Sequence, residues 1–392
     1  MTPSARVQAA IDILDEVIAS AVANGPPADA IVRGYFKTRR YAGSKDRRAV
    51  RELVFRAIRH SGERPGNGRA AMVALASDDT DLAALFDGST HGPAPIAEGE
   101  GVADSSVVPE WLQSELSPHV GEEEWAALVE RAPLDLRVHV AKTDREAMLA
   151  AFEGAEATPH SPWGLRLSAD TRIDDSQPYR VGEVEVQDEG SQLVALAAAP
   201  EDGEVVLDLC AGAGGKALAL AAAAPGARIV ASDVSLQRLS ALAPRAERAG
   251  APIETLLLDP PREAEALAPL DGQCDLVLVD APCSGSGTWR RNPEGRWRLT
   301  PERLNRLAET QARVLDLAAP CVKPGGRITY AVCSLLTREG AGQVEAFLSR
   351  HSGWTCEDVL DFVGRTEGGG RLLTPGHDGT DGFFVATLRR AC

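Results

Sequence analysis

The sequence has no long hydrophobic run, and this absence excludes a helix that spans a membrane. No stretch of about eighteen or more apolar residues occurs, and the alanine-rich segment 217–224 is too short to cross a bilayer. The N-terminal segment carries acidic residues within its apolar pattern, unlike the core of a secretory signal. We therefore expect a cytoplasmic protein without a membrane segment.

Clustered cysteines are also lacking. All seven cysteines lie in the C-terminal half, no two have the Cys-x-x-Cys spacing, and the seven histidines are scattered. Disulfide frameworks and zinc sites both need clustered spacing. We therefore expect free thiols and no metal site. Because free cysteine is usually buried, Cys210, Cys274 and Cys321 are expected in the core.

Positive charge is scarce overall but locally concentrated. The formal net charge is −16, which by itself argues against nucleic-acid binding. Between Arg33 and Arg69, however, twelve Lys or Arg residues occur with only three Asp or Glu residues. This segregation predicts a basic face that contacts a phosphate backbone. A solvated, arginine-rich helical surface would give the same pattern.

Apolar periodicity divides the chain into three parts. Residues 1–132 are predicted to be helical, and Ser44 is expected to cap the helix over 44–60. The first helix shows three- and four-residue spacing at Val7, Ile11, Leu14, Val17, Ile18 and Val22. Residues 133–187 mix short strands with a helix, which predicts a small α+β connector. Residues 188–392 alternate apolar strands with helices, which predicts a mostly parallel sheet covered on both faces.

A glycine-rich turn follows the first strand of the third part, in VVLDLCAGAGGKALAL. Gly212, Gly214 and Gly215 let the backbone approach a ligand that a Cβ would exclude. The next strand ends in Asp233, where a carboxylate can accept hydrogen bonds from a ribose diol. The turn lacks the dinucleotide glycine spacing, which disfavours a dehydrogenase. A tight turn whose acid caps the helix after Ser235 is the structural alternative.

Acids and cysteines follow the strands of the predicted sheet. Ligands of open α/β sheets bind at the carboxyl ends of the strands. Four strands of this part end in acids, namely Asp208, Asp233, Asp259 and Asp280. Cys283 and Cys333 also lie just beyond strands, in loops, so both thiols are expected at the same edge and able to react.

These motifs resemble the RsmB/Nop2/Sun family of RNA 5-methylcytosine methyltransferases. The resemblance covers residues 186–388 and rests on VQDEGSQL, DLCAGAGGK, DAPCSGSGT with RRNPEGRW, VKPGGRITYAVCSL and DGFF. More loosely, the helical N-terminus resembles the NusB-like RNA-binding domain of the RsmB branch. The resemblance implies an α/β fold with a Rossmann-like catalytic domain, preceded by an all-α NusB-like domain and the connector.

The family resemblance also implies a reaction and its site. A methyl group would pass from S-adenosylmethionine (SAM) to C5 of a cytosine in RNA through a covalent cysteine–C6 adduct. The resemblance to the RsmB branch makes 16S rRNA the expected substrate. Cys333 would be the nucleophile, Cys283 would act in product release, and Asp280 would lie where cofactor and base meet. The implied cofactor-binding residues are Cys210, Ala211, Gly212, Ala213, Gly214, Gly215, Lys216, Asp233, Arg238, Asp259 and Asp280.

Two positions depart from the family pattern. Ala213 replaces a proline that stiffens the turn, and Val332 replaces a threonine beside the nucleophile. We expect the first change to be tolerated because the glycines remain, whereas the second bears on the rate. The roles of Cys283 and Cys333 could also be exchanged, since DNA 5-cytosine methyltransferases use a Pro-Cys that resembles Pro282-Cys283.

Basic residues in two regions are candidate RNA contacts, namely Arg39, Arg40, Lys45, Arg47, Arg48, Arg290 and Arg291. Trp289 and Trp297 interleave with arginines and could stack on bases, although burial of Trp297 in the core is equally compatible with the pattern. Methylation of tRNA, a non-catalytic RNA-binding role in ribosome assembly, and methylation of a small molecule or a protein are the alternative functions. We expect a monomer.

Overall fold

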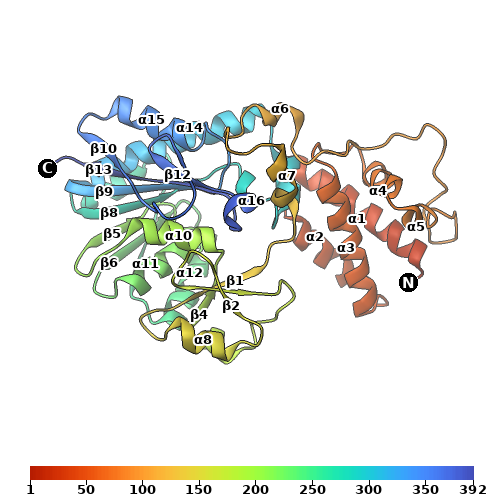
Figure 1. Cartoon of the computed structure of the whole chain (residues 1–392), viewed down its shortest axis with the longest axis horizontal. Coiled ribbons are helices and arrows are strands. Elements are labelled where there is room, and N and C mark those ends of the chain that lie inside the picture. The colour runs from red at the N-terminus through yellow and green to blue at the C-terminus, as the bar shows by residue number, and fades with distance from the viewer. The chain divides into compact units, whose positions relative to one another are not determined.

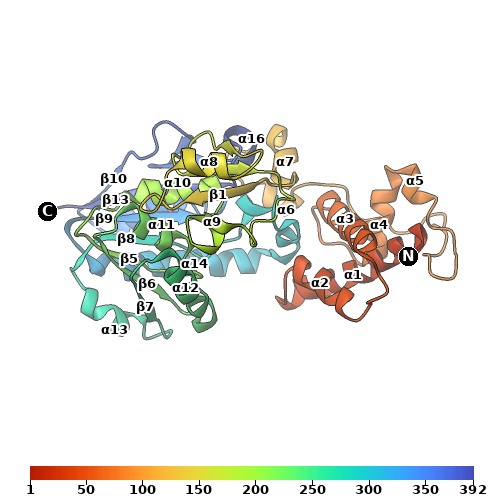
Figure 2. The same cartoon turned by 90° about the horizontal axis from the view of Figure 1, so that it is seen from below.

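A computed structural model describes all 392 residues, and contacts within the chain divide it into two units. The helical unit comprises residues 1–116, 121–130 and 288–301, and the sheet unit comprises residues 117–120, 131–287 and 302–392. Figures 1 and 2 show both units from two directions. The chain therefore passes from the sheet unit into the helical unit and back, directly after the loop that carries Cys283.

The helical unit is built around three helices that pack against one another, α1, α3 and α4. Its elements are α1 (Pro3–Ala23), α2 (Ala28–Lys37), α3 (Ser44–His60), α4 (Gly68–Ser77), α5 (Thr80–Ala83), α6 (Glu110–Gln113), α7 (Glu122–Val129) and the short helix η3 (Pro293–Arg298). The predicted apolar stripe of α1 is buried from Val7 to Ile18. Val22, in the last turn of α1, is the exception and is 61% exposed.

The helix predicted over 44–60 is confirmed as α3, but the predicted cap residue is wrong. Gly43 is the N-cap and Ser44 is already the first helical residue. The carboxylate of Asp46 accepts a hydrogen bond from the backbone N–H of Gly43, and this contact stabilises the first turn in place of a serine cap.

A segment that is distant in sequence completes the core of the helical unit. Trp297 is 1% exposed, lies in the same apolar cluster as α1, and donates from Nε1 to the carbonyl of Ser61 at 2.9 Å. Arg296 is equally buried and donates to the carbonyl of Ile58 at 2.6 Å. Trp297 is therefore a core residue, which confirms the structural alternative for this position.

Residues 134–186 of the sheet unit form a four-stranded antiparallel sheet in the order β2-β3-β1-β4. Its elements are β1 (Leu134–Val138), α8 (Arg145–Ala151), β2 (Glu156–Ala157), β3 (Gly164–Leu167), α9 (Gln177–Arg180) and β4 (Val184–Val186). This sheet has an apolar cluster of its own, centred on Leu136, Leu165 and Val184. It forms the small α+β element that the period of the sequence predicts.

The main sheet has nine strands, eight of them in the order β11-β12-β13-β9-β8-β5-β6-β7, with β10 paired to β13. Five neighbouring strands, β9, β8, β5, β6 and β7, are parallel. The strands β10, β11, β12 and β13 make antiparallel pairs, including the pair of β13 with β9. The strands are β5 (Val205–Asp208), β6 (Arg228–Asp233), β7 (Ile253–Leu257), β8 (Cys274–Asp280), β9 (Val322–Val332), β10 (Trp354–Glu357), β11 (Arg365–Glu367), β12 (Gly370–Leu373) and β13 (Phe383–Arg390).

Helices cover both faces of the main sheet. Figure 1 shows α10, α11 and α12 on one face and α14 and α15 on the other. The helices are α10 (Glu189–Ala198), α11 (Gly215–Ala223), α12 (Leu236–Ala249), α13 (Glu263–Leu267), η1 (Ala268–Leu270), η2 (Ser286–Thr288), α14 (Pro301–Cys321), α15 (Ala341–Arg350) and α16 (Pro375–Asp378). None of the helices in the chain combines the length and apolar character that a bilayer crossing requires.

The buried position of Trp297 generates a stability prediction. We expect Trp297→Ala to lower the free energy of unfolding of the helical unit by about 3–5 kcal/mol, because it leaves a cavity in the core. Urea unfolding followed by far-UV circular dichroism measures this loss. Tyr41→Ala is the control, because Tyr41 is an aromatic of the same unit that is 74% exposed. Equal unfolding midpoints for the two variants would contradict the assignment.

Candidate active site

Two cysteines from separate loops meet at one edge of the main sheet. Cys283 lies three residues beyond the end of β8 at Asp280, and Cys333 directly follows β9. β8 and β9 are parallel neighbours, with Asp280 opposite Ala331, so their loops emerge at the same edge. The two sulfur atoms lie 3.4 Å apart although fifty residues separate them in sequence. The structure therefore brings together the two thiols that the sequence marks as reactive.

Either thiol can donate in the hydrogen bond between the two sulfur atoms. The contact with Cys333, burial and the charge of Glu339 together raise the pKa of Cys283 well above the usual thiol range. The two thiols are therefore coupled through one hydrogen bond.

Both cysteines line a cavity of about 440 Å³ in the sheet unit. Its walls come from the glycine turn after β5, the ends of β6 and β8, the two cysteine loops and α14. This volume lies within the range of small-molecule sites. The predicted site residues that line it are Cys210, Ala211, Gly212, Ala213, Asp233, Arg238, Asp280, Cys283 and Cys333.

Four predicted cofactor residues, Gly214, Gly215, Lys216 and Asp259, do not line the cavity. Gly214 has φ +78°, and a Cβ built on it would stand 2.1 Å from Cδ1 of Leu242, so packing against α12 requires this glycine. Asp259 follows β7 by two residues, is 65% exposed and pairs with Arg262. In this conformation Asp259 forms no part of the cavity wall.

Asp233 joins the glycine turn to the start of α12. Its carboxylate accepts hydrogen bonds from the backbone N–H of Gly212 at 2.9 Å and of Ser235 at 2.7 Å. It also pairs with the guanidinium of Arg238 at 2.9 Å. Asp233 thus has the helix-start contact that the structural alternative predicts, and it lines the cavity as well.

Asp280 is held by a buried lysine. Nζ of Lys216, in the first turn of α11, lies 2.7 Å from Oδ2 of Asp280. Burial lowers the pKa of Lys216, but the ion pair and hydrogen bond with Asp280 outweigh it, so the net shift is upward. Lys216 therefore stays charged and balances the Asp280 carboxylate three residues before Cys283.

The chain is similar to known proteins over most of its length. A family model described as 16S rRNA methyltransferase RsmB/F matches residues 195–389. The chain is 35% identical over 301 residues to ribosomal RNA small subunit methyltransferase B of Cronobacter sakazakii, and the alignment covers 75% of this chain and 68% of the relative. The chain belongs to the RsmB/F family.

Further comparisons agree with this membership. The chain is 36% identical over 288 residues to the enzyme of the same name from Enterobacter sp. strain 638, covering 71% of this chain and 66% of the relative. The curated relatives therefore extend beyond the matched region. Among solved structures, PH0851 matches with a TM-score of 0.76 at 23% identity over 98% of this chain and 99% of that chain. NSun6 from Pyrococcus horikoshii matches with a TM-score of 0.63 at 18% identity, over 72% of this chain and 97% of that chain. The predicted fold class is confirmed.

In this RsmB/F family member, Asp208 lies at the end of β5 and is fully buried. Neither of its carboxylate oxygens has a hydrogen-bond partner. Burial, and then the negative charge of Asp280, raise its pKa to about 7. Asp208 does not line the cavity. Its burial away from the cavity makes Asp208 a structural residue of the sheet.

The basic segment of the helical unit presents most of its charge to solvent. Arg40, Lys45, Arg47 and Arg48 are exposed and Arg39 is half-buried. By contrast, Arg290 is only 6% exposed and Trp289 is 1% exposed. Burial of Arg290 argues against the phosphate contact predicted for it, whereas Arg291 is partly exposed.

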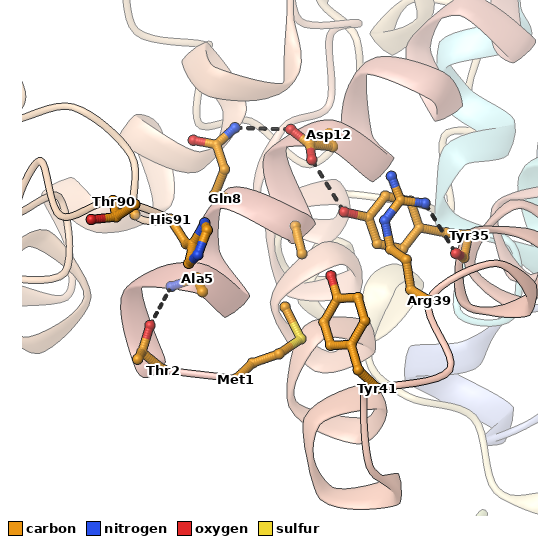
Figure 3. Close-up of a pocket in the computed structure, with 12 residues that line it drawn as sticks. Met1, Thr2, Ala5, Gln8, Asp12, Tyr35, Arg39, Tyr41, Thr90 and His91 are labelled. Carbon is orange, nitrogen blue, oxygen red and sulfur yellow. Dashed lines mark hydrogen bonds between the residues drawn. The ribbon is translucent and has the colours of Figure 1, made fainter.

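A cavity of about 1090 Å³ lies beside the basic segment, within the helical unit (Figure 3). Figure 3 shows Arg39 over the ring of Tyr35, at 3.5 Å from the ring centre. The carboxylate of Asp12 accepts from Nε2 of Gln8 at 2.8 Å and from the hydroxyl of Tyr35 at 3.1 Å. Tyr41, also on the cavity wall, is 74% exposed. Arg39 and Asp12 both contact Tyr35, whereas the ring of Tyr41 is exposed on the same cavity wall.

Sequence reasoning missed the contribution of two helices to the active-site cavity. Glu263 of α13 and Thr310, Arg313, Val314 and Leu317 of α14 line its wall. Arg313 pairs with the buried carboxylate of Glu263. The apolar spacing in 301–317 predicts the helix, but nothing in it distinguishes a cavity face from a core face.

The raised pKa of Asp208 predicts a pH effect on stability. Because the folded state holds this proton up to about pH 7 and an unfolded aspartate releases it near pH 4, stability falls as the pH rises between these values. Asp208→Asn removes this dependence. Relative to the wild type, we expect the variant to gain up to roughly 4 kcal/mol between pH 4 and pH 8. Urea unfolding at both pH values measures the gain, and a difference that does not change with pH would contradict it.

Proposed function

We propose that this RsmB/F family member transfers a methyl group from SAM to C5 of a cytosine in 16S rRNA. The observation that carries the proposal is the 3.4 Å separation of the Cys283 and Cys333 sulfurs on the wall of one cavity. Its curated relatives are named ribosomal RNA small subunit methyltransferase B, which supports 16S rRNA over tRNA as the substrate.

The residues around the glycine turn fit SAM. Gly212 has φ +56°, and nothing lies within 4 Å of the position where a Cβ would stand, so the backbone is open to a ligand. Asp233, at the end of the neighbouring strand β6, offers a carboxylate suited to ribose hydroxyls. Asp233, Arg238 and the turn 210–213 would hold the cofactor. Bound SAM supplies an electrophilic methyl group.

Covalent catalysis explains why a thiol is needed next to this cofactor site. C5 of cytosine is a weak nucleophile, and addition of the Cys333 thiolate at C6 converts C5 into an enamine-like carbon that can attack. Asp280 can hold a proton at N3 of the base or accept a hydrogen bond from the exocyclic amine. Lys216 keeps that carboxylate in place through their ion pair.

The second thiol serves the last step of the proposed reaction. After methyl transfer, C5 carries both the methyl group and its original proton, and the Cys333–C6 bond breaks only when that proton leaves. Cys283 as a thiolate, directly or through a water molecule, would take this proton. The 3.4 Å contact between its sulfur and that of Cys333 supports this role. The target base must leave its stack to reach both sulfurs.

The basic segment is proposed to bind the RNA away from the reacting base. Arg40, Lys45, Arg47 and Arg48 would contact phosphates and set the affinity and its salt dependence, with Arg39 beside them. Arg39 and Tyr41 on the wall of the cavity in Figure 3 would stack on one unpaired base. Asp12 there favours a base edge over a phosphate, because a carboxylate repels phosphate.

The assigned cysteine roles predict opposite behaviour of two variants. Cys333→Ala should abolish methyl transfer and form no adduct, because the nucleophile is gone. Cys283→Ala should accumulate an RNA–protein adduct that survives denaturation, because the C5 proton cannot leave. Denaturing gel electrophoresis with labelled 16S rRNA and SAM detects the adduct.

Equilibrium dialysis with SAM is the control, because both variants should still bind the cofactor. An adduct with Cys333→Ala but not with Cys283→Ala would exchange the two roles. Tritium transfer from labelled SAM to tRNA but not to 16S rRNA would overturn the proposed substrate. No transfer to any RNA by the wild type would favour a non-catalytic assembly factor.

Stacking at the cavity of the helical unit predicts an affinity loss. Tyr41→Ala should weaken binding of a 16S rRNA transcript by about 5- to 150-fold, the range for loss of one base–aromatic stack. Filter binding measures this affinity. Phe362→Ala is the matched control, because Phe362 is a 58% exposed aromatic on the sheet unit. Equal affinities for the two variants would contradict the base-stacking role.

A further inference from the structure

One fully buried carboxylate lies between the two cysteine loops. Glu339 is 0% exposed and follows Cys333 by six residues, just before α15. It lines no part of the active-site cavity, so it does not contact a ligand bound there. Burying a carboxylate costs free energy unless hydrogen bonds compensate for lost water. The hydrogen-bond partners of Glu339 therefore indicate its structural role.

Glu339 accepts hydrogen bonds from the residue that follows each cysteine. The backbone N–H of Ser284 donates to Oε1 at 2.9 Å, and the Ser284 hydroxyl donates to Oε2. The hydroxyl of Ser334 also donates to Oε2, at 2.5 Å. The two hydroxyl oxygens lie 3.3 Å from each other. A single carboxylate thus ties together the loops of Cys283 and Cys333.

Two further contacts fix the carboxylate itself. Nε2 of Gln311, on α14, donates to Oε1 of Glu339 at 2.9 Å and to the carbonyl of Pro282 at 2.9 Å. The hydroxyl of Tyr330, on β9, donates to the backbone carbonyl of Glu339 at 2.6 Å. All these donors are neutral. A carboxylate can accept about four hydrogen bonds, whereas an amide of the same shape must donate with its nitrogen.

We propose that Glu339 is a positioning residue that sets the separation of the Cys283 and Cys333 thiols. It acts through Ser284 and Ser334 and does not touch the reacting base. The catalytic part of this inference depends on the proposed function, in which both sulfurs serve one cytosine. The geometric part depends only on the contacts of the carboxylate.

Glu339→Gln tests the geometry without RNA. Diamide oxidises a close pair of thiols to a disulfide and takes up their two electrons and two protons as it becomes the hydrazine. We expect the Cys283–Cys333 disulfide to form at least ten times more slowly in Glu339→Gln than in the wild type. Mass spectrometry of the linked peptides measures the rate.

Loss of charge alone would have the opposite effect. The negative charge of Glu339 is one cause of the raised pKa of Cys283. Glu339→Gln therefore lowers that pKa and increases the thiolate fraction, which by itself would speed the reaction with diamide. A slower reaction is consequently evidence for displaced thiols.

The same variant tests the link to catalysis. We expect kcat to fall on the order of 100-fold, as for a displaced reacting group, while KM for 16S rRNA and the Kd for SAM stay within about twofold. Glu339→Asp, which keeps the carboxylate on a shorter stem, should recover part of the loss. Ser284→Ala is the second variant if Glu339→Gln does not fold, because it removes one hydroxyl donor and keeps the backbone N–H.

Thr387→Val is the matched control for lost buried polarity. Thr387 on β13 shares a buried hydroxyl contact of 3.2 Å with Thr329 on β9, away from the cysteine loops. Thr387→Val should lower the melting temperature and leave both the rate of disulfide formation with diamide and kcat unchanged. Unchanged diamide rates in Glu339→Gln, whatever happens to kcat, would overturn the positioning role. Slower disulfide formation, with a wild type that methylates no RNA, would support the positioning and refute the proposed function instead.

Discussion

The parallel pairing of β8 with β9 is the constraint on which the site depends. Because parallel neighbours direct their carboxyl ends to the same edge, residues fifty positions apart in sequence emerge side by side. The register sets Asp280 opposite Ala331, and each cysteine then follows its strand within three residues. The separation of the sulfurs is therefore a property of the sheet, which the buried network around Glu339 refines.

The acids at the carboxyl edge of the main sheet differ in burial and in hydrogen-bond and ion-pair partners. Asp208 is buried and raised in pKa, Asp280 is matched by Lys216, and Asp233 is occupied by backbone N–H groups and Arg238. Three strand-end acids thus have three different environments within one edge of the sheet. Each environment suits a different task, because burial favours the neutral acid whereas ion pairs and hydrogen bonds favour the carboxylate.

Much of the fold and the central part of the site could be predicted from the sequence. Strand periodicity followed by Asp233, Asp280 and Cys333 predicts both the sheet and the edge at which these residues meet, since chain direction alone decides that placement. The positions of Arg290 and Trp297 could not be predicted in this way. Arginine interleaved with tryptophan is typical of an RNA surface, and only the path of 288–301 into the helical unit shows that Trp297 is core.

Residues that act through tertiary contacts leave no local pattern. Glu339 stands in a polar turn, where a glutamate is ordinarily exposed, and its burial depends on donors from α14 and from both cysteine loops. Asp259 shows the converse. Its position after a strand predicts a site residue, but in the folded chain it pairs with Arg262 in the turn after β7. In both cases the deciding partners come from the folded chain.

Peptide mapping of a trapped complex tests the central claim most directly. In RNA that contains 5-azacytidine, position 5 of the target base carries no proton for a base to remove after methyl transfer, so the covalent adduct persists on the wild-type protein. Digestion and mass spectrometry then locate the modified cysteine. The account predicts a methylated nucleotide attached to the peptide that contains Cys333. Attachment at Cys283, or no attachment to either sulfur, would contradict it.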